Sequence, residues 1–443
     1  MLAIQVTVAA ITLFATLYTA TLLGDHAYGF VGIFLSIVQV VMTLQALGLN
    51  PSLISQVSEG GPSSTPTILV SFLFFRLLTL FVATLLLIAL GPTVATAFTM
   101  VTEGPEQLID LTHLFLLLAC AMVSIELNAL INTSLIAIQQ SRAAALLSAA
   151  SQLFIAFGML VGAQNGGLDG FFEGYAVGAS AALVVSVCVV TLLVRPKLSF
   201  PTKAQLYEHA RRAKEMSGTS YLTKLIYSLW IRLPVFVGAW VLGPESLGAL
   251  FLATQLAEKF RTLGSSIAPL SQASLSKTLA ESPAAYERQF SQNFRKLFLT
   301  LIMVTMGAIL TAPIFFGLIF PGTYPGLGSY LSLMLLFSVF FLTLNWIGAG
   351  VLYPHQALES LVVVHLVTKT VGAAAMILAA LVFSSATAFL MIFVVSEMGA
   401  AMVYRTKARK VLADSETLPT AIMTSGYFLC FASAALTAHL YGT

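Results

Sequence analysis

Long apolar stretches constrain the fold of this 443-residue chain more than any other feature. A helix needs about 20 apolar residues to cross the hydrocarbon core of a bilayer, and most of these stretches reach that length. Hydrophobic residues make up 58% of the chain and charged residues only 9%, which is too little charge to cover the surface of a soluble domain. The sequence therefore predicts an all-α integral membrane protein with 12–13 transmembrane helices.

The predicted helices cover residues 2–23, 29–51, 67–90, 109–137, 144–163, 171–194, 219–242, 246–271, 295–319, 328–351, 357–382, 385–404 and 419–440. The last of them either crosses the membrane or lies at its surface as an interfacial helix.

The 21 Lys and Arg residues are distributed unevenly around these helices. Fifteen fall in the loops on one side of the membrane, six fall inside apolar stretches, and the opposite loops hold none. Short cytoplasmic loops retain Lys and Arg. We therefore place the basic loops and the N-terminus in the cytoplasm of a bacterial inner membrane. The basic loops either serve orientation alone or include a regulatory patch, and we favour the first interpretation.

A short motif occurs twice at equivalent places. Residues 22–30 read LLGDHAYGF and residues 241–249 read VLGPESLGA, so both follow the pattern apolar-Leu-Gly-x-x-x-x-Gly. Each glycine permits a tight turn or a close helix contact. The second copy comes six helices after the first, so both copies cross the membrane in the same direction. This spacing predicts two six-helix lobes related by an axis along the membrane normal.

The repeat divides the chain into four parts. The N-lobe covers residues 1–195, a basic cytoplasmic linker 196–217, the C-lobe 218–407, and an extra C-terminal helix 408–443. Transporters built from parallel repeats place their substrate between the repeats. We therefore predict a central cavity between the two lobes.

These motifs resemble the polysaccharide transport family, the Wzx-type oligosaccharide-lipid flippases of the multidrug/oligosaccharidyl-lipid/polysaccharide exporter (MOP) superfamily. The resemblance begins with LLGDHAYGFVGIFLSIVQVVMTLQALG at residues 22–48 and continues through residues 231–271. Length, helix number and the basic central loop fit along nearly the whole chain. The Pro-Glu turn usual in the family is Asp25-His26 in the first copy.

The resemblance implies a flippase for undecaprenyl-pyrophosphate-linked glycan repeat units, working by alternating access in polysaccharide or O-antigen biosynthesis. It also implies a polysaccharide polymerase and a chain-length regulator as partners, and no ATP hydrolysis by this chain.

Charges inside the predicted helices are the candidate substrate-binding groups. Charge at membrane depth is costly and usually lines a polar path. Arg232 lies about 20 Å into its helix at 1.5 Å per residue, with Lys224 nearer the cytoplasmic end. Lys369 lies at a similar depth, and Lys259 and Arg76 complete the set. A cationic cavity suits a pyrophosphate, because Arg donors match phosphate oxygens.

The same charges have a second interpretation as ion pairs that hold helices together. Arg76 and Glu126 fall at similar depth and are candidates to pair, with the cavity and the ion pair equally favoured, while Glu397 is a candidate partner of Lys369 or Lys259. Glu126 and Glu397 are also candidates for coupling to protons, sodium or the membrane potential, since ionisable groups inside the membrane often mark ion and proton pathways. His365, one turn before Lys369, is either a further coupling group or a satisfied interior histidine.

Polar stripes on two helices are candidate glycan contacts. Ser36, Gln39 and Thr43 share one face of the second helix, and Ser124, Asn128 and Asn132 do so on the fourth. Such stripes also serve as polar contacts between membrane helices.

Two other classes of function stay open beside the flippase. A multidrug or small-solute antiporter of the same superfamily is the first, although deep positive charge favours an anionic cargo. A membrane glycan polymerase or ligase is the second, but no outer loop carries an acidic catalytic motif. The chain has no phosphate-binding GxxxxGK[ST] motif, and its three cysteines form no CxxC pair. We expect no enzyme activity, cofactor, metal or nucleic-acid partner.

Overall fold

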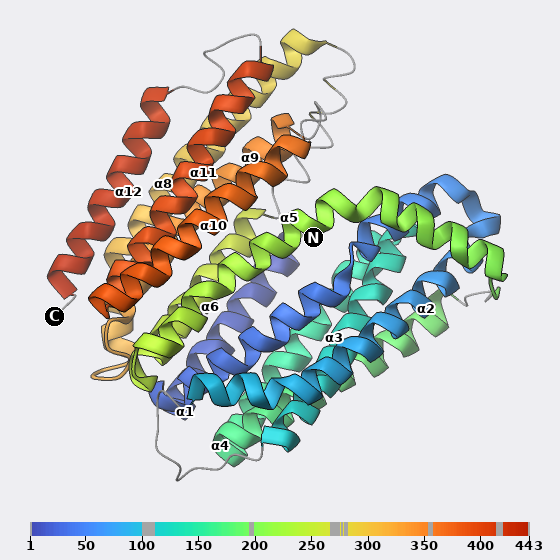
Figure 1. Cartoon of the computed structure of the whole chain (residues 1–443), viewed down its shortest axis with the longest axis horizontal. Coiled ribbons are helices and arrows are strands. Elements are labelled where there is room, and N and C mark those ends of the chain that lie inside the picture. Colours follow the sequence, from blue (N-terminus) through green and yellow to red (C-terminus); the bar gives the residue numbers. More distant parts are fainter. Residues whose placement is uncertain are drawn as a thin grey trace. The chain divides into compact units, whose positions relative to one another are not determined.

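The computed structural model describes residues 2–99, 111–194, 199–265, 275, 278, 282–352, 358–412 and 420–441. This described part of the chain is helical and contains no β-strand (Figure 1). Its helices are α1 (Leu2–Ala46), α2 (Leu49–Thr99), α3 (Leu111–Ala137), α4 (Ser141–Val194), α5 (Lys203–Val241), α6 (Pro244–Ser265), α8 (Pro283–Ile319), α9 (Leu327–Ile347), the π-helical turn η1 (Gly348–Leu352), α10 (Leu358–Phe383), α11 (Ala386–Val411) and α12 (Thr420–Tyr441).

Nine helical segments among the described residues are long and apolar enough to cross a membrane. Two of them, Thr7–Glu59 and Ser141–Leu192, have 53 and 52 residues and so have the length of two crossings each. Their helices are interrupted where the sequence predicts outer turns, at Gly24 (φ 73°) and at Gly166–Gly167 (φ of Gly167 59°). The predicted all-α membrane protein is confirmed.

Two predicted crossings are not among these nine described segments. They correspond to α6, which carries Glu258, Lys259 and Arg261, and to α12. Their passage through the membrane stays a prediction.

Several predicted boundaries are wrong; the helix predicted at 295–319, for example, begins at Pro283. The helix predicted at 29–51 ends at Ala46, because Leu47 (φ 43°) and Gly48 (φ 68°) adopt left-handed backbone. The chain re-enters a helix at once, so α2 begins at Leu49 rather than near residue 67. The basic linker is also helical from Lys203 onward, where pairs such as Arg212 with Glu208 support a turn that hydropathy does not register.

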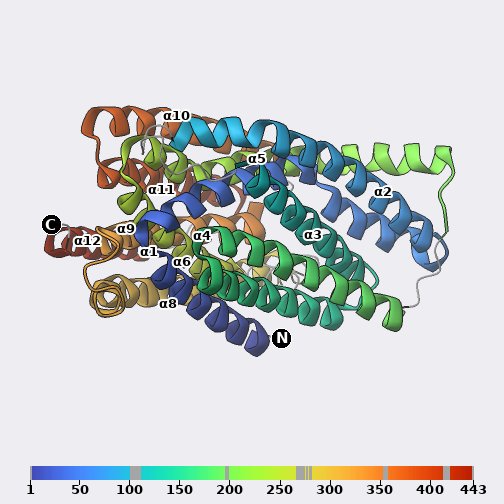
Figure 2. The ribbon, with the colours of Figure 1, turned by 90° about the horizontal axis from the view of Figure 1, so that it is seen from below.

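The described helices form two compact units. The first comprises Met1–Leu23 and Val31–Arg232, and the second comprises Gly24–Phe30 and Leu233–Thr443. In the first unit, α3 packs against both α2 and α4 (Figure 2). In the second unit, α6, α8, α11 and α12 pack on α9, whose side chains are almost all buried, and α10 packs on α11. The lobes predicted from the repeat stay a prediction.

Glycines join the two halves of α4. The helix folds back at Gly166–Gly167, and Gly158 and Gly162 of the first half then meet Gly174 and Gly170 of the second. A Cβ atom on any of these four would collide with the backbone carbonyl oxygen of its partner. The glycines therefore allow a backbone-to-backbone approach of the kind that small-xxx-small motifs permit in membranes.

The two copies of the repeat contact each other inside the second unit. A Cβ atom on Gly29 would lie 2.6 Å from the carbonyl oxygen of Pro244, and one on Gly248 would collide with that of Asp25. In the aligned motifs Asp25 corresponds to Pro244 and Gly29 to Gly248. The two contacts are therefore equivalent: in each, the second glycine of one copy packs against the carbonyl oxygen at the matching position of the other copy.

Candidate functional site

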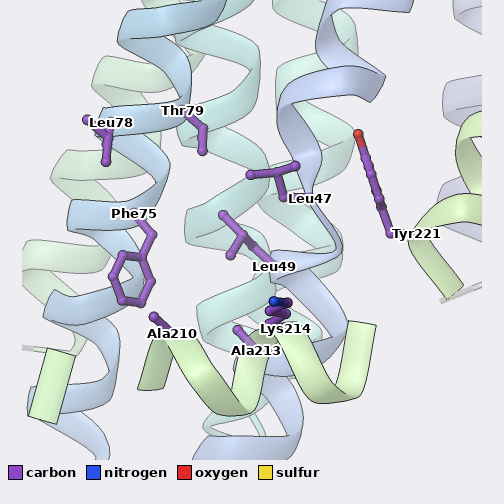
Figure 3. A pocket seen from close by; sticks show the side chains of 9 residues that line it. All are labelled: Leu47, Leu49, Phe75, Leu78, Thr79, Ala210, Ala213, Lys214 and Tyr221. Atoms are coloured by element: carbon purple, nitrogen blue, oxygen red, sulfur yellow. The ribbon is translucent and has the colours of Figure 1, made fainter. Parts of the chain in front are cut away.

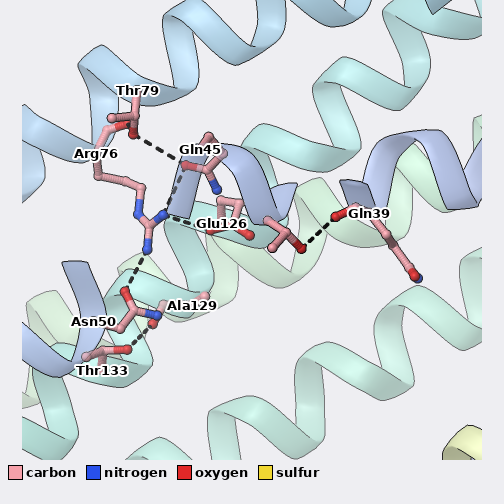
Figure 4. A network of polar contacts seen from close by, with 9 residues as sticks. Gln39, Gln45, Asn50, Arg76, Thr79, Glu126, Ala129 and Thr133 are labelled. Atoms are coloured by element: carbon pink, nitrogen blue, oxygen red, sulfur yellow. Dashed lines mark hydrogen bonds and ion pairs between the residues drawn. The ribbon is translucent and has the colours of Figure 1, made fainter. Parts of the chain in front are cut away.

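Arg76 is the centre of a buried polar network in the first unit (Figure 4). Its side chain is 0% exposed, and its Nη1 lies 3.1 Å from Oε2 of Glu126. Nη1 also donates to Oε1 of Gln45 at 3.0 Å, and Nη2 donates to Oδ1 of Asn50 at 2.6 Å. The predicted Arg76–Glu126 ion pair is confirmed, while a role of Arg76 in substrate binding stays a prediction.

The bend between α1 and α2 brings the two amides to Arg76. Gln45 precedes the left-handed residues Leu47 and Gly48, and Asn50 follows them. The change of direction at this bend allows both side chains to reach one guanidinium group. Gln45 and Asn50 were not predicted, although two amide side chains on either side of Gly48, between apolar stretches, are a signal that could have identified them.

A second polar region lies where α1 meets α5, within the first unit. Thr43 and Ser228 share a hydrogen bond of 2.7 Å between their hydroxyl groups. Ser228 lies between two predicted cations, four residues after Lys224 and four before Arg232, so the three occupy neighbouring turns of one side of α5. We call Gln39, Thr43, Lys224, Ser228 and Arg232 the α1–α5 polar face.

Helix geometry places an amide and a guanidinium at one level of this face. The hydroxyl of Tyr221 donates to the carbonyl oxygen of Leu44 at 2.8 Å, so α5 runs antiparallel to this part of α1. Gln39 and Arg232 then each lie one turn, or about 6 Å, beyond the Thr43–Ser228 bond. Arg232 is buried and Lys224 is exposed. Figure 4 shows the side chain of Gln39 pointing away from the Arg76 network.

Several buried polar atoms of the first unit have no hydrogen-bond partner among the described residues. They include Oε1 of Gln39 and Oδ1 of both Asn128 and Asn132. The amide nitrogen of Asn128 does have a partner, since it donates to the hydroxyl of Ser151 on α4. Buried acceptors of this kind need water or a ligand. Asn128 therefore both joins helices and keeps an acceptor for another partner.

The predicted charges of the second unit form contacts between α10 and α11. Lys369 and Glu397 make a buried ion pair, and Lys369 is one of the two candidate partners named for Glu397. The hydroxyl of Tyr404 lies 2.5 Å from Nε2 of His365, and a coupling role of His365 stays a prediction. Both pairs lie on one face of α10, because residues 365 and 369 are one turn apart. Tyr404 was not predicted.

The two cations of α6, Lys259 and Arg261, are separate from the α10–α11 pairs. Lys259 is half-buried, whereas Arg261 is buried, with its guanidinium 5.3 Å from the centre of the Phe337 ring and its Nη1 donating to Ser338 at 3.4 Å. Such stacking fixes Arg261 against α9. In the part of the chain that the structure describes, no three His, Cys, Asp or Glu side chains group as metal ligands.

Comparison with solved structures decides the fold. A lipid II flippase, MurJ, in an inward closed conformation matches with a TM-score of 0.68 and 11% identity, over 99% of this chain and 97% of that one. An inward-facing multidrug resistance transporter of the MATE family of the MOP superfamily matches with a TM-score of 0.73 and 15% identity, over 96% and 99%. A MOP superfamily transporter from Pyrococcus furiosus with a binding pocket of reverse polarity matches with a TM-score of 0.67 and 15% identity, over 93% of this chain and 94% of that one.

The chain has the fold of the MOP superfamily. No protein-family model matches the sequence, and no curated protein sequence matches it.

The MOP fold agrees with the predicted all-α membrane fold, and together with the nine apolar helical segments it supports a multi-pass membrane protein. Its similar structures are transporters and flippases rather than enzymes. Membership of the Wzx-type family, the inner membrane location and the cytoplasmic N-terminus stay predictions.

Proposed function

We propose that this protein is a flippase that moves undecaprenyl-pyrophosphate-linked oligosaccharide repeat units from the cytoplasmic to the outer face of the inner membrane. The α1–α5 polar face carries the proposal. It combines two cations, Lys224 and Arg232, with the hydroxyl and amide groups of Thr43, Ser228 and Gln39. A pyrophosphate linked to a sugar needs both kinds of group next to each other, because the phosphates bind cations and the sugar binds hydroxyls and amides.

The likeness to a lipid II flippase over almost the full length of both chains also supports this proposal. A lipid II flippase acts on a lipid-linked substrate, which agrees with the cargo that the Wzx resemblance implies. Alternating access, coupling through Glu126, and a polymerase and chain-length regulator as partners belong to the same proposal.

The second candidate is a multidrug or small-solute antiporter, which the likeness to the MATE transporter favours. A cationic drug would be repelled by Lys224 and Arg232, so their charge argues for an anionic cargo. The Pyrococcus furiosus transporter, whose binding pocket has reverse polarity and which is suggested to differ in function, is a precedent for a change of function within this fold.

The experiment that tests the proposal is done on cells lacking the gene. Undecaprenyl-pyrophosphate-linked glycans are isolated, and the membrane face on which they lie is determined. We expect single repeat units to accumulate on the cytoplasmic face and to be cleared by the wild-type gene but not by Arg232→Ala. Unchanged amounts and sidedness would point to a small-solute exporter, and accumulation on the outer face would point to a polymerase or ligase.

A further inference from the structure

A pocket of about 390 Å³ lies in the first unit where the start of α5 meets the α1–α2 bend (Figure 3). Leu47 and Leu49 come from the bend, Phe75 and Leu78 from α2, and Lys214 and Tyr221 from α5. The lining is apolar apart from these last two side chains and Thr79. Pockets of this size hold small ligands or part of a larger one.

The α5 wall of the pocket is fixed in place. The side-chain amide of Gln56 donates to the carbonyl oxygen of His209 at 3.2 Å, and Nδ1 of His209 lies 2.9 Å from Oε1 of Gln56. One turn further on, Ala213 is buried in a cluster with Leu49 and Leu53. Figures 1 and 2 show this first part of α5 lying against the start of α2. The pocket is therefore built by tertiary contacts rather than by a loose surface helix.

The charges around the pocket single out Lys214. Arg212 binds Glu208 at 2.8 Å, and Arg211 lies 3.6 Å from Glu208 and 3.7 Å from Glu215. The hydrogen bond from Arg212 holds the pKa of the Glu208 carboxyl below its usual range, so this acid stays ionised and engaged. Lys214, by contrast, makes no ion pair with any residue that the structure describes. Its charge is available to an anion at the pocket.

Exposed apolar side chains surround the pocket. Leu44, Leu47 and Leu78 are each about half exposed on helices that are long and apolar enough to cross a membrane, so apolar surface continues outward from the pocket. At the start of α5, Phe200 is 85% exposed just before the helix, and Tyr207 is 73% exposed on it. Exposed aromatic rings next to basic residues are typical of a segment at the membrane–water interface.

We propose that this pocket binds one acyl chain of an anionic phospholipid, whose phosphate contacts Lys214. The apolar lining accommodates the chain, and Lys214 is the cation among the residues that line the pocket. Basic residues at a membrane surface attract anionic lipids in the same way. The site differs from the α1–α5 polar face, and the inference does not depend on the cargo of the transporter.

The test uses the full-length protein, purified in a mild detergent, and counts retained lipids by native mass spectrometry. Phosphatidylglycerol and phosphatidylcholine with identical acyl chains are offered separately. We expect wild type to retain one phosphatidylglycerol in preference to phosphatidylcholine. Lys214→Gln should lower that retention about fivefold, the effect of one lysine at a membrane surface. Ala210→Trp, which fills the pocket from α5, should abolish retention of the lipid.

Lys203→Gln is the matched control, since Lys203 lies on the same helix but does not line the pocket. It should retain the lipid like wild type. Equal retention of the two lipids, equal losses in the two lysine variants, or full retention in Ala210→Trp would overturn the proposal. Preferential retention of a polyprenyl phosphate offered in the same way would also overturn it, because the pocket would then belong to the cargo.

Discussion

Arg76 combines full burial with three polar partners, which makes it the residue whose removal has the clearest physical consequence. Its guanidinium is bonded to Glu126, Gln45 and Asn50 from three different helices. Burying such an ion is costly, and the bonds compensate for that cost. Truncating one partner leaves the other charge buried and uncompensated, so the network is sensitive to single substitutions.

We predict that Arg76→Met lowers the free energy of unfolding by about 3–5 kcal/mol, the usual cost of breaking a buried pair. Arg76→Met combined with Glu126→Leu should recover most of the loss, because neither charge then remains. Denaturant unfolding in detergent micelles measures both. Arg142→Met is the control, since Arg142 is exposed, and it should behave like wild type. Equal stability of Arg76→Met and wild type would contradict the role given to the network.

Lys369 has two interpretations, as a substrate-binding group or as part of an ion pair between helices, and its pairing with Glu397 favours the second. Because the charge of Lys369 is compensated inside the second unit, we expect it to join α10 to α11 rather than to bind cargo. Lys369→Ala should reduce the amount of folded protein, and the exchange Lys369→Glu with Glu397→Lys should restore both that amount and transport. Membrane yield and glycan export are the measurements. Restored yield without restored export would instead place Lys369 in the substrate path.

At the scale of the element, the doubled-back helix α4 depends on glycine. Gly162 and Gly170 approach so closely that each would place a Cβ atom on the other's carbonyl oxygen. We predict that Gly162→Val destabilises the protein by about 1–3 kcal/mol through overpacking. Gly307→Ala on α8 is the control, because a Cβ there meets no atom within 4 Å. Thermal unfolding in detergent measures the difference, and equal melting temperatures for the two variants would refute the close packing.

Elements that depend on hydropathy and on glycine turns were predictable. The apolar stretches became helices within a few residues of their expected bounds in most cases, and Gly24 and Gly166–Gly167 interrupt helices where outer turns were expected. The early end of α1 at Ala46 was not predictable, because it requires Leu47 to adopt left-handed backbone. The helical start of α5 was not predicted either, because ion pairs between residues four apart stabilise a helix without any apolar pattern in the sequence.

The candidate site was predictable in its parts but not in its assembly. Arg76 and Glu126 were candidates to pair because their depths agree, whereas Gln45 and Asn50 reach them only through the bend. Likewise, Thr43 and the cations of α5 were each candidates, but nothing local in the sequence indicates that Thr43 meets Ser228, 185 residues away. Contacts between distant residues come from packing, which a single sequence does not specify.

At the scale of the whole molecule, we propose that a MOP-fold transporter with a cationic polar face moves an anionic lipid-linked glycan. The fold itself is common to flippases and drug transporters, so it does not decide the cargo. The charges of α5 carry that decision. Arg232 is the more buried of the two cations on the α1–α5 polar face and therefore the one whose charge acts most strongly on a phosphate.

The most direct test is flipping by the purified protein in liposomes. A fluorescent undecaprenyl-pyrophosphate oligosaccharide is placed in both leaflets, and its exposure to a membrane-impermeant quencher is followed over time. We predict transfer between leaflets with wild type and with Lys203→Gln, and at least a tenfold slower transfer with Arg232→Ala. Transfer of a cationic dye but not of the pyrophosphate lipid, or equal transfer by wild type and Arg232→Ala, would contradict the claim.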